Sequence, residues 1–137
     1  MIDKREVQIG NQNGDHVSLK RVTVTGPEKW FDAEVEVQCD GWRGKIRASF
    51  MEGELTRFAE EIRNLHKNLT GEPVLDPIEP HLTLSLVGDG IGHLSVKGKA
   101  QNHLGSGTEI SFRLDIDQTY LPGIADALSD ADSNSPI

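Results

Sequence analysis

The residues with the widest chemical repertoire in this sequence are five histidines and one cysteine. The histidines are spread along the chain, at His16, His66, His81, His93 and His103. Metal sites built on imidazole need short, defined ligand spacings such as H-E-x-x-H, and no such spacing occurs. A single cysteine, Cys39, excludes an internal disulfide and a cysteine-based zinc site. The sequence therefore predicts no metal and no cofactor, and Cys39 is interpreted as a packing residue because no basic sequence neighbour lowers its pKa.

Motifs for nucleophilic catalysis and nucleotide binding are also missing from the sequence. It contains no G-x-S-x-G, no Walker A loop and no G-x-G-x-x-G after a strand. Residues 88–92 are rich in glycine, but they are expected to join antiparallel strands rather than to open a helix. They would then lack the helix N-terminus that binds phosphate. The sequence therefore predicts a protein that is not an enzyme.

Acidic residues form the remaining chemical cluster, in a stretch near the C-terminus whose only basic residue is Arg113. Paired carboxylates need an apolar pocket to separate their pKa values before they can do acid–base work, and none is visible in the sequence. Docking a basic partner needs only clustering and exposure. The predicted partner-binding residues are Asp115, Asp117, Asp126 and Asp130. Helix capping by Asp117 is the alternative interpretation.

Charge is distributed unevenly along the chain. Residues 1–50 carry eight basic and eight acidic residues, whereas residues 51–137 carry six basic and fourteen acidic residues, so the net charge of −8 belongs to the second part. Nucleic-acid binding needs a basic surface, so this distribution argues against it. It is compatible with a basic protein partner.

Length and hydropathy indicate one domain. The 137 residues suit a single core, with a mean hydropathy of −0.43. No apolar run approaches the roughly 18 residues of a membrane helix, and residues 1–5 are not followed by the apolar segment of a signal peptide. We expect a cytoplasmic domain over residues 1–137, with an ordered core over 4–130 and a frayed segment over 131–137.

Residues 30–51 are the stretch around which the fold is predicted to form. Asp40-Gly41 is typical of a two-residue hairpin turn, because both positions need positive φ. Pairing about this turn places Val35 opposite Ile46 and Cys39 opposite Trp42 on an apolar face, with charged residues on the other face. Slipping the register by one residue would place charges opposite apolar groups along the whole hairpin.

Two helices are predicted beside this hairpin. Apolar residues at helical spacing indicate a long helix over 53–69, namely Leu55, Phe58, Ile62, Leu65 and Leu69. Its apolar stripe is expected to pack on the apolar face of the hairpin, with Gly44 leaving room for close approach. A shorter C-terminal helix is predicted from Leu121, Ile124, Ala125 and Leu128.

The remaining segments are predicted to be strands. A three-strand meander is expected over 80–87, 91–101 and 107–116, with a three-residue loop at 88–90 and a reversal at 102–105. The register places Leu84 opposite Leu94 and Val96 opposite Ile110. On the polar face it places Lys97 opposite Glu109. Strands at 4–9 and 16–25 precede the hairpin, the second with a bulge near Lys20-Arg21. The predicted fold class is α+β, an antiparallel sheet of hairpins and meander covered on its apolar face by the two helices.

Several segments together resemble a known family. They are Phe31-x-Ala33-x-Val35-x-Val37, Asp40-Gly41-Trp42-x-Gly44, Glu54-Leu55-x-x-Phe58, Gly92-His93-Leu94-x-Val96 and Asp117-Gln118-Thr119-Tyr120-Leu121. In this order they resemble the WapI-like bacterial immunity proteins, and related small bacterial families of unknown function, over about residues 30–121. The resemblance implies a protein that neutralises a cognate toxin by binding it. Such toxins are often nucleases with basic substrate-binding surfaces, and the resemblance implies that an acidic inhibitor would associate with them rapidly.

Two other functional classes stay open from the sequence. A cleft between helix and sheet would suit a small-ligand-binding or enzymatic domain. Pairing of exposed sheet edges would suit a homo-oligomeric structural protein.

Overall fold

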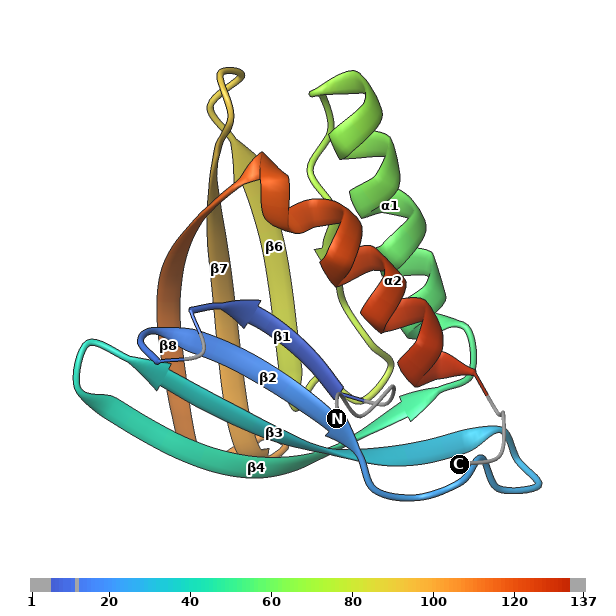
Figure 1. The fold of residues 1–137 in the computed structure, drawn as a ribbon. Helices are drawn as coiled ribbons and strands as arrows, with labels where there is room; N and C mark the ends of the chain where they lie inside the picture. Colours follow the sequence, from blue (N-terminus) through green and yellow to red (C-terminus); the bar gives the residue numbers. More distant parts are fainter. Residues whose placement is uncertain (1–5, 12, 134–137) are drawn as a thin grey trace.

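The structure is a computed structural model, and it describes residues 6–11 and 13–133. Two four-stranded antiparallel sheets cross one another, and two helices lie side by side next to them (Figure 1). The first sheet contains β1 (Glu6–Gly10), β2 (His16–Arg21), β3 (Trp30–Cys39) and β4 (Trp42–Met51) in that order. The second contains β5 (Val74–Leu75), β6 (Leu82–Gly88), β7 (His93–His103) and β8 (Ser106–Asp117). The helices are α1 (Glu54–Asn68), the 3₁₀ turn η1 (Gln118–Tyr120) and α2 (Leu121–Asp132), which confirms the α+β prediction.

The central hairpin has the predicted register along its whole length. Val35 lies opposite Ile46 and Cys39 lies opposite Trp42. Asp40 and Gly41 have φ values of 51° and 85°, as the two-residue turn requires. The apolar face is buried over most of its length, but Trp42 at the tip is 71% exposed.

Strand β2 is shorter than predicted and has no bulge. Its register with β3 is continuous from His16 to Arg21, so the bulge predicted near Lys20-Arg21 is wrong. Val22 and Val24, which suggested a change of phase, lie beyond the strand and are exposed. Of the strand predicted over residues 4–9, positions 4 and 5 lie outside the described residues.

The second sheet has the predicted strands in a different register. Leu84 pairs with Gly98 instead of Leu94, and Val96 pairs with Leu114 instead of Ile110. The connection between β6 and β7 is also longer than the predicted three-residue loop. The Asp89 carboxylate accepts hydrogen bonds from the backbone N–H groups of Ile91 (2.8 Å) and His93 (3.1 Å), which fixes a wider turn.

Helix α1 forms where it is predicted, but it packs mainly against other elements. Its buried residues include Leu55, Phe58 and Ile62, whereas Leu69 follows the helix and is half exposed. The helix contacts α2 and β5, and it meets β4 only in part. The second sheet approaches the hairpin instead, because a Cβ on Gly44 would lie 3.8 Å from Cδ1 of Ile110 in β8. The prediction that Gly44 makes room for the helix is therefore wrong.

The end of α2 is bound to the rest of the fold by two buried charged side chains. Asp132 accepts hydrogen bonds from the N–H groups of Gly53 (3.0 Å) and Thr56 (2.8 Å) and from the Thr56 hydroxyl (2.8 Å), so it caps the start of α1. Arg21 donates to the carbonyl oxygens of Ala131 (3.0 Å) and Ser133 (2.9 Å). The helix therefore extends beyond residue 130, where the ordered core was expected to end. Residues 134–137, the rest of the segment expected to fray, lie outside the described residues.

Candidate partner-binding surface

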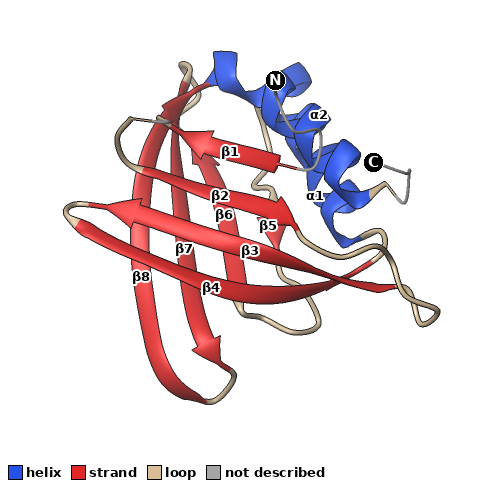
Figure 2. Ribbon diagram, turned by 60° about the horizontal axis from the view of Figure 1, so that its bottom comes forward, coloured by secondary structure: helices blue, strands red, loops and turns tan. Residues whose placement is uncertain are grey.

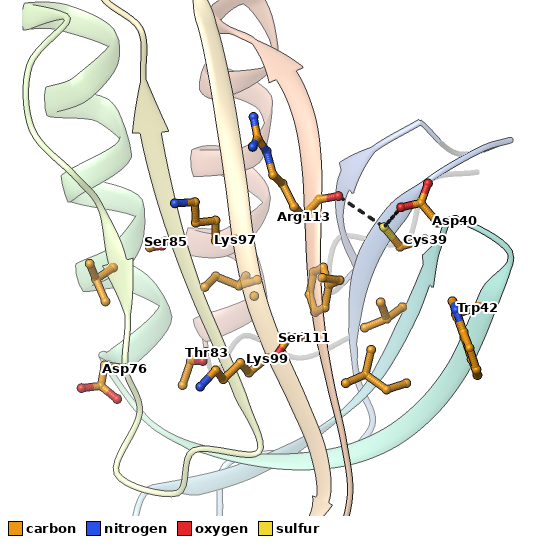
Figure 3. Close-up of a pocket in the computed structure, with 16 residues that line it drawn as sticks. Cys39, Asp40, Trp42, Asp76, Thr83, Ser85, Lys97, Lys99, Ser111 and Arg113 are labelled. Carbon is orange, nitrogen blue, oxygen red and sulfur yellow. Dashed lines mark hydrogen bonds between the residues drawn. The ribbon is translucent and has the colours of Figure 1, made fainter.

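A groove of about 850 Å³ lies on the solvent face of the second sheet (Figure 3). Residues of β6, β7 and β8 form its floor, and its solvent-facing floor side chains are Thr83, Ser85, Lys97, Lys99, Ser111 and Arg113. The tip of the β3–β4 hairpin, with Asp40 and Trp42, borders one side. Asp76, which follows β5, borders the other.

Strand alternation explains why these side chains share one face. Ser85, Lys97 and Arg113 are direct neighbours across β6, β7 and β8, and Thr83, Lys99 and Ser111 form the next row. Side chains alternate between faces along a strand, so the intervening residues point to the core. The apolar alternation that builds the core therefore also collects the polar side chains on the outer face.

The floor of the groove carries three positive charges close together. Lys97 and Arg113 are directly opposite one another, which places their Cβ atoms about 5 Å apart. Lys99 lies two residues along β7, about 7 Å from Lys97. Arg113 has an exposed ion pair with Asp115 (3.6 Å), whereas within residues 6–11 and 13–133 neither lysine has an acidic partner. Like charges directly opposite in a sheet are destabilising, so this arrangement has an energetic cost in the free protein.

The four predicted partner-binding aspartates fall into two groups. Asp115 and Asp117 lie on β8, on the same face as the groove. Asp126 and Asp130 lie one turn apart on α2 and are exposed. Asp126 is 3.1 Å from the Arg63 guanidinium of α1. The structure therefore does not bring all four carboxylates into one patch.

Asp117 has a structural role that the alternative interpretation predicted. It accepts hydrogen bonds from the N–H of Thr119 (2.8 Å) and from the Thr119 hydroxyl, so it caps η1. These hydrogen bonds, with a smaller contribution from His93 on the adjacent strand, lower the pKa of the Asp117 carboxyl. The pKa of Asp89 is lowered in the same way, mainly by the N–H of Ile91. Both carboxyl groups therefore keep their charge to a lower pH than an ordinary aspartate does.

One set of side chains of the metal-ligand type lies at the rim of the groove. Ligand atoms of Asp15, Cys39 and Asp40 lie within 4.8 Å of one another. Burial raises the pKa of the Cys39 thiol, and the two carboxylates raise it further. The thiol donates to the Arg113 carbonyl oxygen at 3.2 Å. A thiol held in its protonated form is a poor metal ligand and a poor nucleophile, so this cluster is suited to packing the hairpin tip against β8.

The space between helix and sheet is smaller than the groove. A hollow of about 380 Å³ lies between α1 and β5, lined by Glu54, Arg57, Glu61, Val74, Leu75, Asp76 and Pro77. The sequence predicted a possible ligand cleft here, between helix and sheet, and did not predict the neighbouring groove, which shares Val74 and Asp76 with this hollow. The sequence did contain a sign of the groove, because strand alternation places Lys97, Lys99 and Arg113 on the same face of the sheet. The predicted register concealed it by placing Lys97 opposite Glu109, whereas Glu109 pairs with Gln101.

Fold and surface together define a small α+β protein with a groove on its second sheet, where three cationic side chains lie among apolar residues and the exposed Trp42 forms part of the border. The immunity protein WapI-like family matches residues 8–134. The chain belongs to this family, as the resemblance over residues 30–121 indicated. No curated protein sequence matches the chain.

Solved structures include a distant likeness of the fold. A chain from "Crystal structures of trypanosoma bruciei MRP1/MRP2" is 10% identical, with 92% of this chain and 81% of that chain covered and a TM-score of 0.45. Among the described residues, no helix is long and apolar enough to cross a membrane.

Proposed function

We propose that this protein neutralises a toxin by binding to it, without chemistry of its own. Membership of the immunity protein WapI-like family over residues 8–134 is the observation that carries the proposal. Burial raises the pKa of Cys39, which adds support, because a thiol with a raised pKa is not activated for nucleophilic attack. Binding alone inhibits a toxin when the bound protein covers the surface that the toxin needs.

The proposed partner is a basic toxin in the cytoplasm of the cell that makes it. A net charge of −8 raises the association rate with a basic surface and repels other acidic proteins. The proposed contacts are Asp115 and Asp117 on β8, and Asp126 and Asp130 on α2. Self-association through the outer edges of β4 or β8 remains compatible with this role.

Co-expression with a candidate toxin domain from a neighbouring gene tests the proposal. We expect cells that make the toxin domain to survive when this protein is present, and the two chains to purify as a complex. Survival without a complex, or a complex without survival, would contradict neutralisation by binding. Failure of both, with tight retention of a small molecule, would favour the ligand-binding alternative.

Variants that replace carboxylates with amides test the proposed contacts. The double substitution Asp126→Asn and Asp130→Asn removes two exposed carboxylates from α2, and Glu6→Gln with Glu109→Gln removes two exposed carboxylates elsewhere. Because both double variants change the net charge equally, only specific contacts distinguish them. We expect the α2 variant to dissociate from the toxin about tenfold faster, as a loss of about 1.4 kcal/mol implies. Equal dissociation rates for the two variants would remove α2 from the interface.

A further inference from the structure

We propose that the groove on the second sheet binds an acidic segment of the toxin, with Lys97, Lys99 and Arg113 as the ion-pairing groups. The inference rests on the proposed function, because it names the surface and the chemistry by which the partner is recognised. The protein has a net negative charge, but in this groove it presents a local cluster of positive side chains to the partner.

The charge arrangement within the groove is the first argument. Lys97 lies directly opposite Arg113, and Lys99 is adjacent along the same strand. Within the described part of the chain, both lysines lack an ion pair, although the protein as a whole has an excess of carboxylates. Such an arrangement is unfavourable in isolation and becomes favourable when an anionic partner lies between the cations.

The borders of the groove favour a polypeptide over a nucleic acid. Asp76 lies at one border, Asp40 lies at the other, and Asp115 follows Arg113 along β8 (Figure 3). A nucleic-acid strand is charged at every nucleotide, so it would place phosphates against these carboxylates. A polypeptide can present a few carboxylates to the cations at the centre of the groove and basic residues to the carboxylates at its borders.

The aromatic, hydroxyl and apolar groups of the groove suit a protein interface, and the apolar ones include Val74, Ile110 and Phe112. Trp42 at the border is 71% exposed, and Trp and Arg are the residues most often found as energetic anchors in such interfaces. The hydroxyl groups of Thr83, Ser85 and Ser111 lie beside the cations and can donate hydrogen bonds to carboxylates. Asp115 and Asp117 lie on the same face, so a partner seated in the groove could also reach them.

Titration of the full chain with a synthetic peptide tests the inference. The probe has four consecutive glutamates flanked by two lysines on each side, and the control peptide has the same composition with alternating charges. We expect the clustered peptide to shift the amide NMR signals of residues 83–85, 97–99 and 111–113 and the indole signal of Trp42. Shifts confined to α2, or equal shifts from both peptides, would overturn the inference.

A pair of variants separates the groove from general electrostatics. Lys97→Gln with Lys99→Gln removes two charges from the groove, and Lys20→Gln with Lys67→Gln removes two exposed charges elsewhere. We expect about tenfold weaker peptide binding for the groove variant and no change for the control, a difference of about 1.4 kcal/mol. Equal weakening would contradict a specific site. Tighter binding of an oligothymidylate than of the peptide would identify a nucleic-acid groove and overturn the inference.

The same groove variant distinguishes this inference from the proposed function. In cells that make the toxin, we expect the Lys97→Gln/Lys99→Gln protein to protect less well than the Lys20→Gln/Lys67→Gln protein. Full protection by both variants would refute the groove while leaving neutralisation intact. Loss of protection by the unmodified protein would refute neutralisation itself.

Discussion

At the scale of single residues, the molecule depends on two buried charged side chains, one of which, Asp132, lies in the segment that the sequence predicted to fray. Asp132 is 3% exposed and provides the cap that the α1 N-terminus lacks locally, because Gly53 at that position has no side chain. Arg21 is 4% exposed and stacks on the Phe31 ring at 4.2 Å while it binds the end of α2. Both side chains act over a long sequence separation, so no local motif reveals them.

Replacing Asp132 should destabilise the fold. Asp132→Ala leaves the N–H groups of Gly53 and Thr56 without their acceptor, and hydrogen bonds of this charged type contribute about 2 kcal/mol. Urea denaturation measures the loss. Asp130→Ala, an exposed position on the same helix, is the matched control and should change stability by less than about 0.5 kcal/mol. Similar losses for the two variants would show that the cap has no special role.

The Cys39 thiol should react slowly at neutral pH. Its pKa lies above the ordinary value of 9.0, mainly because of burial, so iodoacetamide alkylation should rise with a midpoint above pH 9.0. Because Asp40 and Asp15 also raise this pKa, Asp40→Asn should move the midpoint down. The folded state favours the protonated thiol, so its contribution to stability is complete below pH 9.0 and is lost as pH rises through the folded pKa. Free cysteine, measured in parallel, should react at lower pH; the reverse order would contradict the assignment.

At the scale of elements, the register of the second sheet is fixed by a tight fit at one glycine. A Cβ on Gly98 would lie 2.3 Å from Cζ of Phe112 and 2.9 Å from Cδ2 of Leu84. The Phe112 ring thus occupies the space that a side chain at position 98 would need. The pairing of Leu84, Gly98 and Phe112 in one row follows from this fit.

Two of the strand glycines, Gly98 and Gly44, should therefore respond differently to the same substitution. Gly98→Ala forces the Phe112 ring and Leu84 to move, and overpacking of this kind costs about 1–3 kcal/mol. Gly44→Ala meets nothing closer than 3.8 Å and should be neutral, or slightly stabilising because alanine restricts the unfolded chain. Thermal denaturation of both variants measures the change in stability that each substitution causes. A destabilised Gly44→Ala protein would indicate a close approach that the structure does not show.

At the scale of the whole molecule, the two sheet-plus-helix halves are interlocked. Helix α1 follows the first sheet but packs on β5 of the second, whereas α2 follows the second sheet but packs on β1 of the first (Figure 2). The two helices also pack against each other. Side chains from both sheets and both helices join one buried cluster.

Neither half should fold without the other. A fragment over residues 1–70 would leave the apolar stripe of α1 without α2 and β5, and a fragment over 71–137 would leave α2 without β1. We expect both fragments to lack cooperative thermal transitions by circular dichroism, and their equimolar mixture to regain one. The intact chain is the control and should unfold in a single transition by circular dichroism and by tryptophan fluorescence. Two separate transitions would contradict interlocking.

The sequence by itself determined the features that depend on local chemistry and on alternation. The Asp40-Gly41 turn sets the hairpin register, because two consecutive residues with positive φ leave few other geometries. The apolar spacing of α1 and α2 sets their buried faces, and strand alternation sets which side chains face the core. The side of the sheet on which Lys97 and Arg113 lie was thus available from the sequence.

Only the tertiary structure decided how these faces align. Moving the partner of Leu84 from residue 94 to residue 98 keeps every side chain on its face, so alternation cannot separate the two registers. The packing of Phe112 over Gly98 distinguishes the observed register from the predicted one. This contact forms only when β6, β7 and β8 are paired. The groove with its opposed Lys97 and Arg113 follows from the observed register, so it could not be read from the sequence.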